Sequence, residues 1–162
     1  MRLAFLLGIL VVLAAPAGSQ ATGIQPAGCS GIGGSFAVVP GSAGAGNIVY
    51  ALRLHDRGAT ACLLRGLPQL RLLGAGGRAL PTSVVADPRF KPVPFLLRPG
   101  RTATARARFS PDVPGTGEQA PGPCEPIART ARVLAAGTSV VVPLRPPTRV
   151  CSHGRLVFTP YR

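Results

Sequence analysis

The chain has 162 residues, of which 46 % are hydrophobic, and it carries a formal net charge of +13. Its 21 glycines and 18 prolines exclude long helices. Because these breakers are spread between short apolar runs, they favour turns between β-strands over disorder. The charge comes almost wholly from arginine, since Lys91 is the one lysine and only five residues are acidic.

Residues 1–21 are expected to be a signal peptide. Arg2 supplies the positive start, an apolar run extends from Leu3 to Ala15, and Ser19-Gln20-Ala21 fits the small-x-small cleavage rule, with residues 15–17 as an alternative. The run is shorter than the roughly 20 residues that a membrane-spanning helix needs. A lipoprotein anchor at Cys29 is disfavoured because no leucine stands three residues before it. We therefore expect a secreted or extracytoplasmic protein, soluble after cleavage and without a transmembrane segment, with residues 22–162 as one domain.

The mature chain shows short strand patterns separated by glycine and proline. In residues 47–58, large apolar side chains recur at the period of two that strands require, and the inner face is expected to hold Ile48, Tyr50, Leu52 and Leu54. Residues 101–109 repeat the pattern with small residues, and the expected inner face is Ala103, Ala105, Ala107 and Phe109. Further strands are expected near residues 36–39, 70–72, 95–97, 132–135, 139–144 and 156–159, with a glycine turn after Leu73 leading to an edge segment. Seven or eight such strands predict an all-β, antiparallel two-sheet sandwich.

Four cysteines, an even number in an exported chain, predict disulfides, and the sequence leaves three connectivities open. Nearest-neighbour pairing would close two loops, each stabilising the fold by about 3.5 kcal/mol on the loop-entropy model. A zinc site is disfavoured because zinc-binding cysteines come in closely spaced C-x₂₋₄-C pairs, which are absent here.

The order of several motifs resembles a known family. CLLRGLP (62–68), LRPGRTATARARF (97–109) and CSHGRLVFTP (151–160), together with the four cysteines, resemble the secreted actinobacterial proteins grouped as domain of unknown function 4232. The resemblance covers Cys29 to Pro160. It implies an immunoglobulin-like β-sandwich with two disulfides, often lipid-anchored, and it brings no catalytic residues.

We expect Cys29 to pair with Cys62 and Cys124 with Cys151. Residues 55–73, HDRGATACLLRGLPQLRLL, then form one stapled corner of the sandwich. This chain departs from its relatives in lacking a lipobox and in placing His55-Asp56 where they tend to have asparagine.

No catalytic site, metal site or cofactor is expected. His55 and Asp56 are neighbours in a strand and point to opposite faces, while His153 lies in a loop far along the chain. The carboxylates Asp112, Glu118 and Glu125 fall in a proline- and glycine-rich loop, and no G-x-S-x-G motif or phosphate-binding loop occurs. The alternative is a secreted hydrolase whose polar groups meet only in the fold, which requires a carboxylate within about 4 Å of a histidine or serine.

The remaining candidate site is a set of outward-facing arginines: Arg53, Arg71, Arg106 and Arg108. Arginine forks bind phosphate, sulfate or carboxylate groups. Sequence-specific nucleic-acid binding is disfavoured because the chain has two Tyr, six Phe and no Trp for stacking on bases. We expect a non-enzymatic exported binding or structural domain of the cell envelope, whose partner is an anionic cell-envelope polymer or another secreted protein. The competing explanations are arginines that reflect coding bias alone, and a chaperone-like role marked by an exposed apolar patch.

Overall fold

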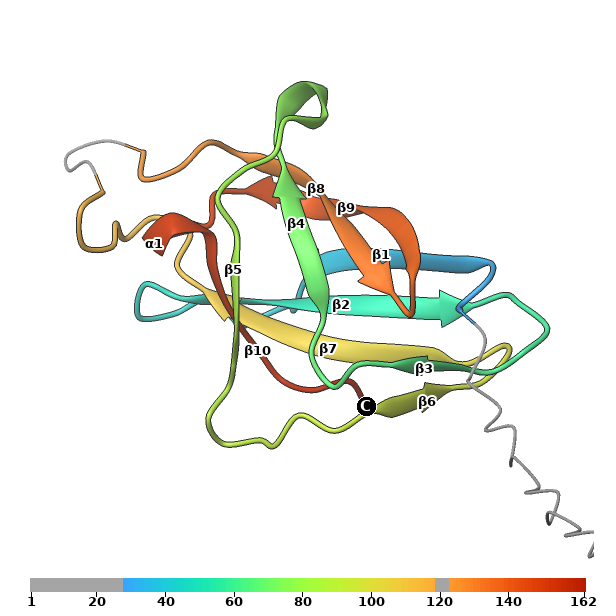
Figure 1. The fold of residues 1–162 in the computed structure, drawn as a ribbon. Coiled ribbons are helices and arrows are strands. Elements are labelled where there is room, and N and C mark those ends of the chain that lie inside the picture. Colours follow the sequence, from blue (N-terminus) through green and yellow to red (C-terminus); the bar gives the residue numbers. More distant parts are fainter. Residues whose placement is uncertain (1–27, 119–122) are drawn as a thin grey trace, which may run out of the picture.

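The computed structural model describes residues 28–118 and 123–162, where the fold is built from ten β-strands (Figure 1). The strands are β1 (Ile32–Val38), β2 (Ile48–Asp56), β3 (Cys62–Leu64), β4 (Gln69–Leu73), β5 (Ser83–Ala86), β6 (Phe95–Leu97), β7 (Thr102–Phe109), β8 (Ala128–Ala135), β9 (Thr138–Thr148) and β10 (Arg155–Phe158). Two single turns, η1 (Ala75–Gly77) and α1 (Cys151–Gly154), are the helices of this part of the chain. Neither is long and apolar enough to cross a membrane. The expected signal peptide, residues 1–21, lies outside the described residues.

Eight strands form a single sheet in the order β4-β8-β9-β1-β2-β7-β10-β5, and β3 and β6 form a separate ribbon. The long strand β9 joins what would otherwise be two sheets, because it pairs antiparallel with β8 and, further along, parallel with β1 at Leu144 and Arg145. A hollow lined by Leu70 of β4 and Val84 of β5 shows that the two outer strands lie near each other. The all-β prediction is confirmed, but eight of the ten strands form one nearly closed barrel rather than the expected antiparallel two-sheet sandwich, and two of its pairings, β1 with β9 and β10 with β5, are parallel.

The two strands with the clearest sequence pattern, β2 and β7, lie side by side in the middle of the sheet. Their register pairs Tyr50 with Ala107 and Leu52 with Ala105, and all four residues are fully buried. The alanines of β7 take little space, which leaves room in the barrel for the large side chains of β2 and β1. Alternation then sends the even-numbered residues of β7 outward, as predicted.

Aromatic side chains fill the centre of the barrel. The ring of Phe36 in β1 contacts Tyr50 edge-to-face, with centroids 5.6 Å apart, and stacks on Phe158 of β10 at 6.0 Å. The Tyr50 ring also lies 5.2 Å from that of Phe109. The Tyr50 hydroxyl donates a hydrogen bond of 2.9 Å to the carbonyl of Pro146, so its polar end is satisfied at the end of β9. One contact set thus ties β1, β2, β7, β9 and β10 together.

Both expected disulfides are present, Cys29–Cys62 and Cys124–Cys151. The first joins the segment before β1 to the start of β3. The chain then breaks at Gly66, where an added Cβ would lie 2.6 Å from the Val93 backbone nitrogen, so no larger residue fits. β4 follows at once, and the predicted stapled corner at residues 55–73 is confirmed.

The packing predicts a sharp contrast between neighbouring residues of β7. Ala105→Val adds volume to a filled core and should lower the free energy of unfolding by about 1–3 kcal/mol. Thr104→Val, on the outward face, should change it by less than about 0.5 kcal/mol. Urea unfolding of the two variants and the wild type measures both values, and equal losses would contradict the assignment of the two faces.

Candidate anion-binding site

A tight turn after β5 positions the first groups of the site. The backbone N–H of Asp87 donates to the Phe158 carbonyl at 2.8 Å, and the N–H of Phe90 donates back to the Asp87 carbonyl at 3.0 Å. Pro88 occupies the second position of this turn, where its fixed φ is favoured, and the Asp87 side chain accepts the N–H of Arg89 at 3.1 Å. The sequence Asp-Pro-Arg-Phe therefore fixes Asp87 and Arg89 beside the end of β10.

Asp87 and Arg89 form a two-pronged ion pair. Nη2 of Arg89 lies 2.6 Å from Oδ2 of Asp87, and its Nε lies 3.0 Å from Oδ1. These side-chain hydrogen bonds, then the Arg89 backbone N–H, and then the charges of Arg89 and Arg108 hold the pKa of Asp87 at about 2, below its ordinary value of 3.8. Asp87 is consequently an ionised carboxylate whose charge is already engaged by Arg89.

The segment that follows β10 runs along β7 and brings in another arginine. Thr159 donates its N–H to the Arg106 carbonyl at 2.9 Å, and the backbone groups of Arg162 and Thr104 exchange two hydrogen bonds of 2.9 and 3.1 Å. The side chain of Tyr161 is buried between these contacts, and burial raises its pKa well above the usual value. The segment is thereby anchored from Thr159 to Arg162, and the exposed Arg162 lines the same hollow as Asp87.

These elements enclose a hollow with a volume of about 220 Å³ on the outer face of the barrel. Four arginines line it: Arg89, Arg106, Arg108 and Arg162. The one carboxylate in the lining is Asp87, and Val49 and Val157 supply an apolar floor. Within residues 28–118 and 123–162, Asp87–Arg89 is the one ion pair between an arginine and a carboxylate. Three of the four guanidinium groups therefore have no acidic partner among the described residues.

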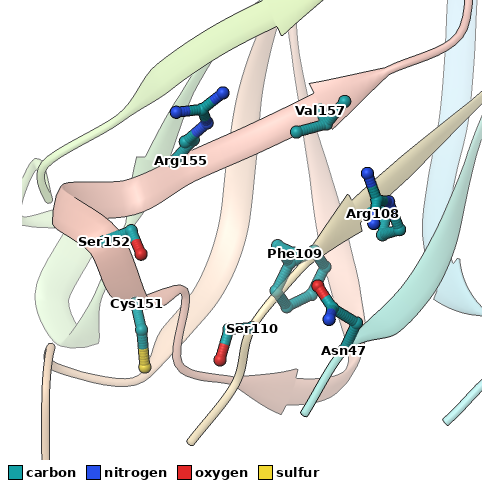
Figure 2. A pocket seen from close by; sticks show the side chains of 8 residues that line it. All are labelled: Asn47, Arg108, Phe109, Ser110, Cys151, Ser152, Arg155 and Val157. Atoms are coloured by element: carbon teal, nitrogen blue, oxygen red, sulfur yellow. The ribbon is translucent and has the colours of Figure 1, made fainter. Parts of the chain in front are cut away.

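A second hollow, of about 250 Å³, continues the first because both are lined by Arg108 and Val157 (Figure 2). Figure 2 shows Arg108 on β7 and Arg155 at the start of β10, with the hydroxyls of Ser110 and Ser152 beyond them. Both hollows together present five arginines, which we call the arginine face: Arg89, Arg106, Arg108, Arg155 and Arg162.

The structure places the four arginines expected from the sequence in different positions. Arg106 and Arg108 are in the arginine face. Arg53 is exposed and pairs with Thr104, two residues along from the pair of Ala51 and Arg106, so it borders the face without lining either hollow. Arg71 lies on the outer strand β4 opposite Arg132 and does not extend the patch.

Arg89, Arg155 and Arg162 were missed at the sequence level. Arg162 reaches the face only because its segment hydrogen-bonds to β7, and no periodicity marks that pairing. For Arg89, the Asp-Pro turn was a usable signal, since it predicts where the residue after proline is held.

His55 lies where the sequence predicts, whereas His153 has contacts that the sequence did not predict. His55 hydrogen-bonds Thr102 across the outer face, with Nδ1 and Oγ1 3.1 Å apart, whereas Asp56 is buried and accepts the Gly58 N–H at 2.8 Å. The two residues face opposite sides, as predicted. His153 instead lies within 4.0 Å of two carboxylates, Glu118 and Glu125, although both belong to a proline- and glycine-rich loop in which no such contact was predicted. The signal that could have found them was the Cys124–Cys151 disulfide, which brings residues 125 and 153 together.

The family described as "Domain of unknown function (DUF4232)" matches residues 29–162, which include all four cysteines and the whole described barrel. The chain belongs to the DUF4232 family. No curated protein and no solved structure matches the sequence. In this DUF4232 domain the arginine face gathers five arginines around one carboxylate that is already paired.

The Asp87–Arg89 pair predicts how the stability of the fold depends on pH in the acid range. The pKa of Asp87 is lowered from 3.8 to about 2 in the folded state, so its carboxylate stabilises the fold above pH 3.8. This contribution is lost as the pH falls from 3.8 to about 2. Asp87→Asn should be less stable than wild type at neutral pH, and the difference should shrink toward pH 2. Thermal melts from pH 2 to 7 test this, with Asp112→Asn as an exposed control; a difference that does not vary with pH would contradict it.

Proposed function

We propose that this DUF4232 domain is a non-enzymatic binding or structural module of the cell envelope that holds an anionic polymer, or an acidic surface of another protein, against its arginine face. The observation that carries the proposal is the lining of the first hollow, in which four arginines meet a single carboxylate that is already paired. Like charges held together on a sheet surface destabilise a fold unless counter-charges approach them. A bound anion supplies that counter-charge.

The geometry suits a chain of anionic groups. Arg106 and Arg108 leave the same face of a rigid strand, so their backbone positions are about 6.7 Å apart. Each guanidinium offers a planar fork that matches phosphate, sulfate or carboxylate oxygens. Because the strand already fixes the spacing of the two Cα atoms, no backbone has to become ordered when a ligand binds. The apolar floor of Val49 and Val157 accommodates the carbon backbone that links such groups.

The aromatic residues favour polymers without bases. Phe36, Tyr50, Phe109 and Phe158 are buried in the barrel, and Phe90 is the one strongly exposed aromatic ring among the described residues. Single-stranded nucleic acids are usually held by several stacking platforms, so this surface offers too few. We favour a phosphate- or carboxylate-bearing envelope polymer over nucleic acid.

The proposed location outside the cytoplasm is supported by two features. Disulfides such as Cys29–Cys62 and Cys124–Cys151 persist mainly in oxidising compartments. The N-terminal sequence has the charge, apolar run and cleavage pattern of a signal peptide over residues 1–21. We infer that the domain is exported and acts after cleavage.

The hydrolase alternative gains one observation, because His153 has carboxylates at 3.9 and 4.0 Å from its Nδ1. These separations are longer than a hydrogen bond, so neither carboxylate orients the ring as a catalytic partner would. Glu118 is moreover occupied by backbone N–H groups, at 2.6 Å from those of Gly115 and His153. We therefore favour the binding function.

The proposal predicts a salt-dependent interaction that two residues control. The purified mature domain should be retained on heparin and on isolated cell-wall polymer, and retention should fall steeply as salt rises. In Arg106→Gln/Arg108→Gln, the slope of log affinity against log salt should fall by about 2, one unit for each lost contact. Since both side chains face solvent, the Tm should stay within a few degrees of wild type.

The matched control is Arg78→Gln/Arg98→Gln, which removes the same charge from exposed positions outside both hollows. If the control loses as much affinity as the test variant, net charge alone explains the binding and the arginine face has no special role. A large fall in Tm for the test variant would show that Arg106 and Arg108 support the fold instead.

A further inference from the structure

Three side chains from distant parts of the chain meet beside the second disulfide. Glu118 precedes Cys124, Glu125 follows it directly, and His153 lies two residues after Cys151. One carboxylate oxygen from each glutamate and one ring nitrogen of His153 all lie within 4.8 Å of one another. The two glutamates and the histidine are residue types that bind divalent metal ions.

Glu118 is the fixed member of the cluster. Its side chain is only 2 % exposed, and its two oxygens accept the backbone N–H groups of His153 and Gly115, each at 2.6 Å. Burial alone would raise the pKa of this carboxyl, but the N–H groups of His153, Gly115 and Ser152 and the charge of His153 bring it below the ordinary value. Glu118 is thus an ionised carboxylate in a nearly dry position, and each of its oxygens keeps a lone pair for another partner.

Glu125 places a second carboxyl group against the first. Its side chain is 13 % exposed, and burial, followed by the charge of Glu118, raises its pKa. The chain is rich in arginine, yet none lies within 4 Å of either carboxylate in the described part of the molecule. Two adjacent carboxylates without an arginine between them are unfavourable in a poorly solvated place, and a cation between them removes the repulsion.

His153 completes the cluster in the orientation that a metal ion requires. Its Nε2 lies 3.3 Å from the Thr116 carbonyl, which can only accept, so Nε2 carries a proton in this contact and Nδ1 is the nitrogen that a metal ion would bind on the neutral ring. Nδ1 lies 4.0 Å from Oε1 of Glu118 and 3.9 Å from Oε1 of Glu125. A ring nitrogen held through a hydrogen bond on its other side is the usual arrangement of metal-binding histidines.

The backbone of α1 is shaped to hold the ring there. Ser152 and His153 both adopt positive φ, 58° and 55°, a conformation that non-glycine residues adopt only under constraint. The side chain of His153 is 62 % exposed, so one side of the cluster faces solvent. A metal ion in the cluster would therefore have room for a water molecule or another ligand.

We propose that Glu118, Glu125 and His153 form a binding site for a divalent transition-metal ion of the zinc type. Zinc bonds of about 2.0–2.2 Å to nitrogen and oxygen in a tetrahedral arrangement place the ligand atoms about 3.4 Å apart. The distances from Nδ1 to the two carboxylates are about half an ångström longer, so a small inward shift of the exposed ring closes the site. A mixed nitrogen and oxygen donor set with three protein ligands suits zinc better than calcium, which takes six to eight oxygens.

The test is zinc titration of the mature domain with its disulfides intact, followed by calorimetry near neutral pH. Wild type should bind one zinc ion per chain. His153→Asn removes the imidazole while keeping a residue that tolerates positive φ, and it should raise the Kd by more than about tenfold, since even changes outside the first coordination shell have effects of that size. Glu125→Gln should weaken binding similarly.

The matched control is His55→Asn, which removes the other histidine from its contact with Thr102 on the outer face. It should bind zinc as wild type does, and near-ultraviolet circular dichroism should show that all variants keep the native fold. Absence of zinc binding by folded wild type, or equal binding by wild type and His153→Asn, would overturn the proposal. A loss of affinity in His55→Asn matching that in His153→Asn would also overturn it.

Discussion

The strict alternation along β7 is the constraint on which the rest of the structure depends. Ala103, Ala105 and Ala107 are fully buried, and their small size lets β7 lie close over the aromatic centre formed by Phe36 and Tyr50. Successive side chains of a strand point to opposite faces. Since the alanines occupy the inner face, Arg106 and Arg108 lie on the outer face. The alternation along β7 therefore produces both the tightly packed core and the exposed positive charge.

The few carboxylates of the chain explain why that charge is left free. Asp56 is buried and caps the turn at Gly58, Asp87 is paired with Arg89, and Glu118 and Glu125 gather around His153. Asp112 alone is exposed and outside any ion pair among the described residues. Asp112 lines neither hollow, so no free carboxylate lies at Arg106, Arg108 or Arg162 among the described residues, and an external anion is the partner that we propose for them.

Sequence reasoning succeeded where a local periodicity decided the structure. The faces of β2 and β7, the corner after Cys62 and both disulfides followed from alternation, from glycine and proline positions and from cysteine order. It was less successful for the sheet as a whole, because β9 lies between β8 and β1 and continues to Thr148, whereas the Arg-Pro-Pro sequence after Leu144 indicated that the strand ends there. The beginning of β1 was also missed, since Gly34 is typical of loops, yet its missing side chain is what allows Arg53 and Val142 to lie so near.

The candidate sites were predicted less well than the strands, because most of their residues come from loops and turns. Glu118 and His153 are 35 residues apart, and they meet through hydrogen bonds to backbone groups that no sequence pattern encodes. Arg89 and Arg162 reach the arginine face from a turn and from a segment beyond the last strand. Residues brought together by loops leave no period in the sequence, whereas residues on one strand do, which is why only Arg106 and Arg108 of this face were identified in advance.

The position of β10 has a consequence for the order in which the molecule can form. This strand, last in the chain, lies inside the sheet between β7 and β5 (Figure 1). Without residues 155–162, β5 has no partner strand, the core lacks Phe158, and the first hollow lacks Val157, Thr159 and Arg162 of its lining. Pairings between strands so far apart along the chain form slowly, because the intervening loop must close first. The charged surface therefore cannot be complete until β10 has paired, and before that step β5 and β7 each keep an unpaired edge.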